Sequence, residues 1–224
     1  MQSESTRLTL LVTQALEQIG IPYAVGGSLA SSVHGVMRST LDVDIVADMR
    51  LEHIQALVAA LSKEFYADDE MMKDAIERHS SFNLIHYETA FKVDIFIRKL
   101  RAFDQIQLER RRTSVIAIDP EQSVYVVSPE DIILAKLEWY RIGGEVSDRQ
   151  WRDILGVLKT KSGELDIDYL KKWARELKVS DLLERVLKEA HIFGDGAQTL
   201  DDHRGRGRGR FLVRAWDRVA AHLD

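Results

Sequence analysis

The chain has 224 residues, 45% of them hydrophobic and 30% charged, which is enough for a sizeable core in one large domain or two small ones. Its formal net charge of −5 and isoelectric point near 5.8 argue against a protein that coats nucleic acid through bulk electrostatics. The lack of cysteine excludes disulfides, thiolate zinc sites and cysteine nucleophiles, and it suits the reducing cytoplasm, where we expect the protein to act.

The first part of the chain reads as a helix, a strand and a short helix. Apolar residues recur at helical spacing up to Ile19, and Gly20 ends this segment. Polar residues interrupt it, so it lacks the apolar stretch of a signal peptide, and no run in the chain approaches the length of a membrane span. A short strand at residues 23–25 leads into a Gly-Gly turn, where we expect Ser28 to cap a short helix that ends near Gly35.

Strands dominate the next part of the chain. Residues 41–46 alternate apolar and acidic side chains, as a strand with two different faces does. We further expect a helix at residues 51–65, a hairpin of strands at 81–87 and 91–97, a helix at 101–112, and strands at 115–118 and 124–127.

From Ser128 onward the pattern is helical. Ser128-Pro129-Glu130-Asp131 is typical of a helix start, with a cap, a proline at the first helical position and an acid three residues after the cap. Further helices are expected at residues 149–158, 168–177 and 181–190. The predicted fold class is therefore α+β, with a mixed β-sheet flanked by helices in a domain over residues 1–127, a helical domain over 128–194, and a flexible Gly- and Arg-rich segment over 195–224 that has the pattern of a last amphipathic helix at 211–223.

Basic residues cluster in two places. Six lysines and arginines between positions 98 and 112 are opposed by only two acids, and four arginines stand among glycines at positions 204–210. Charge runs of this kind are usually solvated faces. The alternative is contact with RNA, which the first cluster slightly favours.

Three acids on expected strands are candidate metal ligands. Asp42 and Asp44 are one residue apart, so both carboxylates project from one face of their strand and can reach one or two hard cations, although the same spacing is often only the polar side of a strand. Asp94 is a single acid in an otherwise apolar strand, where it could instead be an edge charge that discourages aggregation. Together the three acids can hold two magnesium ions that bind a nucleoside triphosphate and activate an attacking hydroxyl.

The Gly26-Gly27-Ser28 turn suits the phosphates of such a nucleotide. Glycines let the backbone approach closely, and a helix start offers unpaired N–H donors. An ordinary strand-to-helix turn has the same composition. The position of the turn shortly before the paired acids, with Arg38 and Thr40 between them, favours the phosphate-binding interpretation.

Lys136 interrupts the apolar face that Ile132, Ile133, Leu137 and Tyr140 form on the helix from Ser128. A lysine whose stem snorkels to water would explain this position, and so would an ammonium that reaches nucleotide phosphates across the domain junction. His34 lies between the glycine turn and the acids and could approach the site, but we expect it on a helix surface.

These residues together resemble the signature of a known superfamily. Val25-Gly26-Gly27-Ser28-Leu29-Ala30, continued by Gly35, Arg38-Ser39-Thr40 and Asp42-Val43-Asp44, is similar to the motif of the polymerase-β-like nucleotidyltransferases and, more narrowly, to the AbiEii-like bacterial group, which includes nucleotidyltransferase toxins. A looser similarity spans roughly residues 20–160 and includes the helix from Ser128 and Trp151-Arg152-Asp153-Ile154-Leu155. The resemblance implies that the triphosphate binds to Gly26, Gly27 and Ser28, that magnesium binds to Asp42, Asp44 and Asp94, and that Asp153 belongs to the nucleotide site, a role that its spacing alone does not suggest.

We therefore expect a magnesium-dependent nucleotidyltransferase that moves a nucleoside monophosphate from an NTP to an acceptor hydroxyl, with the nucleotide between the two domains. Asp94 would act as base for the acceptor, Lys136 would neutralise phosphate charge and Arg38 would assist. The acceptor can be RNA such as tRNA, a protein or a small molecule, and the resemblance adds a toxin–antitoxin role with a cognate antitoxin. The alternative is a non-catalytic nucleotide-binding or antitoxin-type protein of the same fold, against which the presence of all three acids argues.

Overall fold

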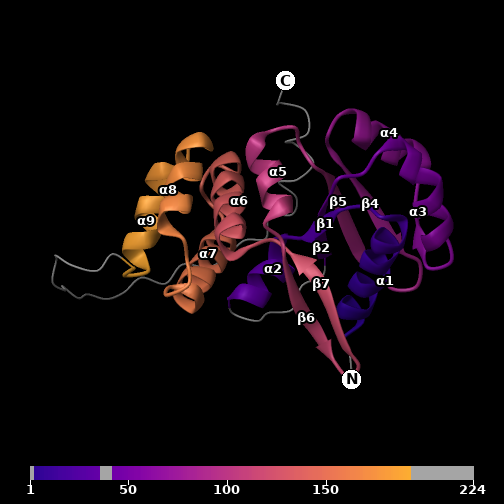
Figure 1. Ribbon diagram of the computed structural model, residues 1–224, viewed down its shortest axis with the longest axis horizontal. Helices are drawn as coiled ribbons and strands as arrows, with labels where there is room; N and C mark the ends of the chain where they lie inside the picture. Colours follow the sequence, from indigo (N-terminus) through magenta and orange to yellow (C-terminus); the bar gives the residue numbers. More distant parts are fainter. Residues whose placement is uncertain (1–2, 36–41, 193–224) are drawn as a thin grey trace.

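A seven-stranded mixed β-sheet lies at the centre of the computed structural model, which describes residues 3–35 and 42–192 (Figure 1). Its strands are β1 (Tyr23–Val25), β2 (Asp42–Ala47), β3 (Phe65–Tyr66), β4 (Ser81–His86), β5 (Lys92–Ile97), β6 (Arg112–Ile118) and β7 (Glu121–Val126). They lie in the order β3-β4-β5-β2-β1-β7-β6, in which β2 and β5, and β1 and β7, are parallel neighbours while the remaining pairs are antiparallel. The predicted α+β class with a mixed sheet is confirmed.

Helices and strands are interspersed along the described chain up to β7, and the elements described after β7 are helices. The helices before β7 are α1 (Glu4–Ile19), α2 (Gly27–His34), a 3-10 turn η1 (Leu51–His53), α3 (Ile54–Leu61), α4 (Asp69–Glu77) and α5 (Ala102–Glu109). After β7, the described chain up to residue 192 contains only α6 (Pro129–Ile142), α7 (Asp148–Lys161), α8 (Ile167–Glu176) and α9 (Ser180–Glu189). Helices α1, α3 and α4 lie on one side of the sheet, and α2, α5 and the later helices lie on the other (Figure 1).

The change from strands to helices falls where the sequence indicated, because strong local signals mark the start of α6. Ser128 Oγ accepts a hydrogen bond from the Asp131 N–H at 3.2 Å, and Pro129 occupies the first turn, where its missing N–H costs no helical hydrogen bond. The end of α1 is equally local, since Gly20 adopts a left-handed φ of 82° that glycine tolerates best. A division into domains at this point stays a prediction, and the tail over residues 195–224 lies outside the described residues.

Two predicted helices are shorter than expected. The segment 51–65 is a 3-10 turn followed by α3, and Phe65 at its end is a fully buried residue of β3 that pairs with His86. The segment 101–112 ends as a helix at Glu109, and Arg112 already pairs with Val126 in the β6–β7 hairpin. In both segments, strand pairing overrides the local helical pattern, with β4 for Phe65 and with the neighbouring strand of a hairpin for Arg112. Helix α4 was not predicted.

Candidate active site

Asp42, Asp44 and Asp94 project from one face at the centre of the sheet. Strands β2 and β5 are parallel neighbours, and their register pairs Asp44 with Asp94 and Asp42 with Lys92. Paired residues on neighbouring strands share a face, and residues two apart on one strand do so as well. The alternate residues Val43 and Ile45 are fully buried on the other face.

The three acids lie close together, and the pKa of one of them, Asp44, is strongly raised. Burial raises the pKa of Asp44 to about 7, and the charges of Asp42 and Asp94 add to the effect, while the ammonium groups of Lys136 and Lys92 oppose it. Lys92 Nζ lies 2.8 Å from Asp94 Oδ1. Ionised carboxylates crowded in this way are stabilised by a cation, and two lysines already supply part of that charge.

The glycine turn lies directly against Asp44. Gly27 has a φ of +53°, and a Cβ on this residue would overlap the Asp44 carboxylate, so no other residue type fits the present arrangement. The Gly26 N–H also donates to the Asp44 carbonyl at 2.8 Å. The turn and the acidic strand, which the sequence connected only by spacing, are therefore in contact.

Ser28 does not have the capping position predicted for it. Helix α2 begins at Gly27 with Gly26 at the cap, so Ser28 lies inside the first turn. Its hydroxyl is instead a hydrogen-bond partner of Arg149, whose Nη2 lies 3.3 Å from Ser28 Oγ. The cap prediction was wrong because the close contact between Gly27 and Asp44 sets where the helix begins.

Lys136 and Asp153 form an ion pair beside the acidic face. Lys136 Nζ of α6 lies 3.0 Å from Asp153 Oδ2 of α7, and the two side chains are only 10% and 11% exposed. The snorkelling interpretation is excluded by this burial, and the effect of Lys136 on the pKa of Asp44 places its charge near the acids. The structure explains the acid at position 153 by its ion pair with Lys136. The spacing along α7 did not reveal this role, because the partner is on another helix.

The structure describes His34 but not Arg38, the two remaining residues considered for this site. His34 is buried, not on the surface as expected: its Nε2 lies 2.7 Å from the Val127 carbonyl, which can only accept, so Nε2 donates and the ring ties the end of α2 to the residue after β7. Burial lowers the pKa of His34 and so favours the neutral ring. Arg38 lies outside the described residues.

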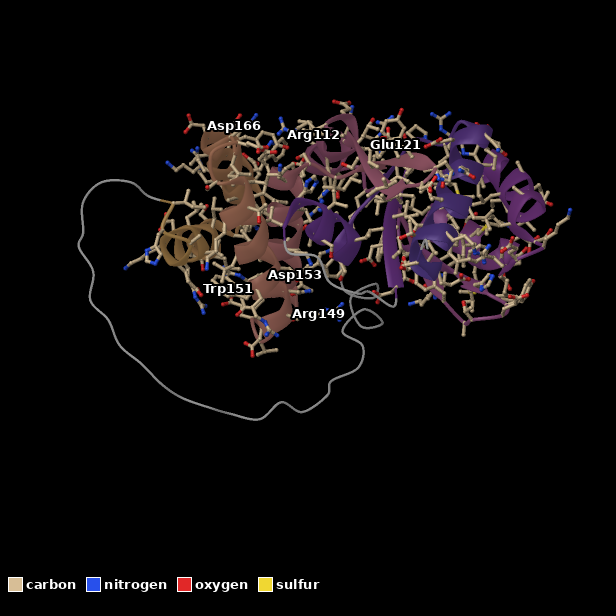
Figure 2. All side chains as sticks on the ribbon, turned by 90° about the horizontal axis from the view of Figure 1, so that it is seen from below. Arg112, Glu121, Arg149, Trp151, Asp153 and Asp166 are labelled. Atoms are coloured by element: carbon tan, nitrogen blue, oxygen red, sulfur yellow. The ribbon has the colours of Figure 1, made fainter. Side chains whose placement is uncertain are left out.

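Arg149 is a residue of this region that the sequence analysis missed. It lies in the first turn of α7, one helical turn before Asp153, and Figure 2 shows both on the side of α7 away from Trp151. Trp151 instead contacts α9, donating from Nε1 to Glu189 at 2.8 Å. The four-residue spacing of Arg149 and Asp153 was the available signal.

The basic segment at residues 98–112 is largely neutralised within the molecule. Arg101 pairs with Asp104 and Glu138, and Arg110 pairs with Glu130 at 3.2 Å while its guanidinium stacks 3.9 Å from the centre of the Tyr169 ring. Glu130 is almost fully buried. Part of the charge that indicated RNA contact in the sequence is therefore compensated within the molecule.

The donor chemistry of the acidic face suits magnesium. Its donors are carboxylate oxygens, which hard cations prefer, and their mutual repulsion at Asp44 is what a bound cation would relieve. Within residues 3–35 and 42–192, no three His, Asp or Glu side chains form a ready-made metal site. Magnesium is commonly held by one or two carboxylates together with substrate phosphates, so the donor chemistry fits a metal that arrives with a nucleotide.

The chain is similar to several solved structures at low sequence identity. No protein-family model and no curated protein matches the chain, so the narrower AbiEii-like assignment has no support there. Similar solved structures include an antigenic nucleotidyltransferase-like protein from Paracoccidioides brasiliensis, with 17% identity, a TM-score of 0.46 and coverage of 84% of this chain and 94% of that one. A lincosamide antibiotic adenylyltransferase bound to lincomycin has 16% identity, a TM-score of 0.42 and coverage of 70% and 96%. The Thermotoga maritima CCA-adding enzyme in complex with tRNA has 13% identity, a TM-score of 0.34 and coverage of 86% and 52%.

These similar structures are nucleotidyltransferases or nucleotidyltransferase-like proteins, and lincomycin and tRNA are ligands of those proteins. No helix in the described part of the chain combines the length and the apolar character needed to cross a membrane.

Proposed function

We propose that the protein is a magnesium-dependent nucleotidyltransferase that transfers a nucleoside monophosphate from an NTP to an acceptor hydroxyl and releases pyrophosphate. The observation that carries the proposal is the contact between the glycine turn and the acidic face, in which Gly27 leaves no room for a side chain beside Asp44 and Asp44 is paired with Asp94. Phosphates bound at the turn would meet these carboxylates, and only an intervening cation makes that encounter favourable.

The residues of the site have complementary roles in this proposal. Asp42, Asp44 and Asp94 would hold the metal, which supplies positive charge that orients the phosphates and stabilises the charge that develops during transfer. Asp94 would accept the proton of the acceptor hydroxyl as its oxygen bonds to the α-phosphorus and pyrophosphate leaves. Lys136 would neutralise phosphate charge, and Gly26, Gly27 and Ser28 would bind the phosphates through the turn.

Label transfer tests the proposal directly. The protein is incubated with magnesium and each of the four α-labelled NTPs in turn, together with total RNA, cell protein or a small-molecule extract. The resemblance to toxin-type enzymes makes RNA and protein the first acceptors to try. We expect one fraction to become labelled, and its sensitivity to ribonuclease or protease then identifies the acceptor class.

Two variants make the assay specific. Asp44→Asn removes a proposed metal ligand at nearly constant volume and should abolish transfer, whereas Glu52→Gln changes an exposed acid and should leave it unchanged. Equal labelling by the wild type and Asp44→Asn contradicts the mechanism. Magnesium-dependent NTP binding without label transfer to any fraction supports the non-catalytic binding protein instead.

A further inference from the structure

The contact between Arg149 and Ser28 joins the later helices to the glycine turn. Arg149 Nη2 donates to Ser28 Oγ at 3.3 Å, which is at the long end of the range for such a bond. We propose that Arg149 is a triphosphate-binding residue, whose guanidinium exchanges the Ser28 hydroxyl for the outer phosphates of the nucleotide and so distinguishes triphosphates from monophosphates. The inference rests on the proposed function, because it assigns a new residue to the same site.

Arg149 is held at the turn by the way in which α2 and α7 pack. At the end of α2, a Cβ on Gly35 would lie 3.0 Å from the backbone C of Gly156, so the two helices are in close backbone contact there. Ser28 and Gly35 are separated by seven positions, and Arg149 and Gly156 by the same seven. The helices therefore run in the same direction, touching at Gly35 and Gly156, and the Ser28–Arg149 contact lies about 10 Å back along both.

One face of α7 carries three residues that contact the site or the helix α2 beside it. Arg149, Asp153 and Gly156 follow each other at intervals of four and three residues, which places them on one side of the helix. Asp153 contacts Lys136, and Gly156 contacts the end of α2. Figure 2 shows Arg149 and Asp153 on this side. Arg149 is the member of this row that lies at the glycine turn.

The guanidinium is available for an anionic ligand. Arg149 is exposed, and among the described residues its partner is a neutral hydroxyl, whereas Arg101, Arg110 and Arg141 each pair with carboxylates. A guanidinium presents several donors in a planar fork that matches phosphate oxygens. If the α-phosphorus lies at Asp94, where the acceptor must attack, the phosphates at the turn are the β- and γ-phosphates. Arg149 would then contact a nucleoside triphosphate and miss a monophosphate.

Calorimetric titration of the full chain in magnesium tests the assignment. The probes are the α,β-methylene triphosphate analogues of the four nucleosides, followed by the monophosphate of the nucleoside that the wild type binds most tightly. We expect Arg149→Gln to weaken triphosphate binding about ten- to a hundredfold and to change monophosphate binding less than about twofold. Arg149→Lys should recover part of the loss, because it keeps the charge without the fork.

Arg152→Gln is the matched control, because Arg152 lies on the same helix and its Nε donates to the Asp148 carbonyl at 3.3 Å; it should bind like the wild type. Unchanged triphosphate affinity in Arg149→Gln overturns the inference and leaves the proposed function standing. Equal weakening of triphosphate and monophosphate also overturns it, since that result indicates a role in packing alone. A wild type that binds none of the probes rejects the proposed function and the role of Arg149 with it. Should Arg149→Gln fail to fold, Arg149→Lys serves in its place.

Discussion

At the scale of single residues, Asp44 is closely surrounded by other groups of the candidate site. It is flanked by Asp42 on its own strand and by Asp94 on the next, and its carboxylate occupies the space beside Gly27. The ionised form of the Asp44 carboxyl is electrostatically unfavourable, because burial and the neighbouring negative charges both disfavour it. A residue retained at such a cost is a candidate for function.

We predict that Asp44→Asn stabilises the metal-free protein at alkaline pH and has a smaller effect in acid. The folded pKa of Asp44 is about 7, against an ordinary value of 3.8. The folded state therefore binds more protons between these values, and the associated stability is full below about pH 4 and lost as pH rises through 7. Asparagine stays neutral, so the variant escapes this loss. In urea unfolding with EDTA, the free energy of unfolding of Asp44→Asn relative to the wild type should increase by about 1–3 kcal/mol from pH 5 to pH 8. A difference that is the same at both pH values would contradict the assignment.

At the scale of elements, the start of α6 is a junction where several segments meet. Glu130 pairs with Arg110 and accepts a hydrogen bond from the Asp166 N–H at 3.2 Å. Asp131 accepts a hydrogen bond from the Tyr169 hydroxyl at 2.5 Å. The residues between α5 and β6, the start of α6 and the start of α8 are thus joined through buried acids, whose charges need these partners.

We predict that Arg110→Ala lowers the free energy of unfolding by about 3–5 kcal/mol, because it removes the cation from the buried Glu130 and the stacking partner of Tyr169. Arg78→Ala is the matched control: its pair with Asp74 is exposed and should contribute at most about 0.5 kcal/mol. Urea or thermal unfolding measures both variants. Equal, small losses would show that the basic segment is a solvated face after all.

At the scale of the whole molecule, the site is assembled from both parts of the chain. The sheet provides the acids, α2 provides the glycine turn, and α6 and α7 provide Lys136, Asp153 and Arg149. Helix α2 lies between these groups, packed against β2, α6 and α7. The later helices therefore contribute side chains to the candidate site as well as adding to the core.

We predict that substitutions of the two members of the Lys136–Asp153 pair have different effects on triphosphate binding. Lys136→Met should weaken triphosphate binding about ten- to a hundredfold, because it removes a cation beside the phosphates. Asp153→Asn should preserve or tighten binding, because it releases the ammonium from its carboxylate. Calorimetry with a methylene triphosphate analogue measures both, and the free energy of unfolding of each variant controls for folding. If the two substitutions weaken binding equally, the pair acts through packing.

The sequence by itself determined the features that local chemistry controls. Alternation placed Asp42 and Asp44 on one face of a strand, the cap and proline marked the start of α6 at Ser128, and the order of segments indicated an α+β fold with a mixed sheet. Each of these depends on residues within a few positions of one another.

Only the tertiary structure decided how distant segments meet. It paired Asp94 with Asp44, buried His34 against Val127, gave Lys136 its partner and brought Arg149 to Ser28. It also neutralised much of the basic segment, whose charge looked free in the sequence because Glu130 lies 20 residues after its partner Arg110 and Glu138 lies 37 residues after its partner Arg101. Charge and burial depend on neighbours in space, and a one-dimensional pattern reports only neighbours along the chain.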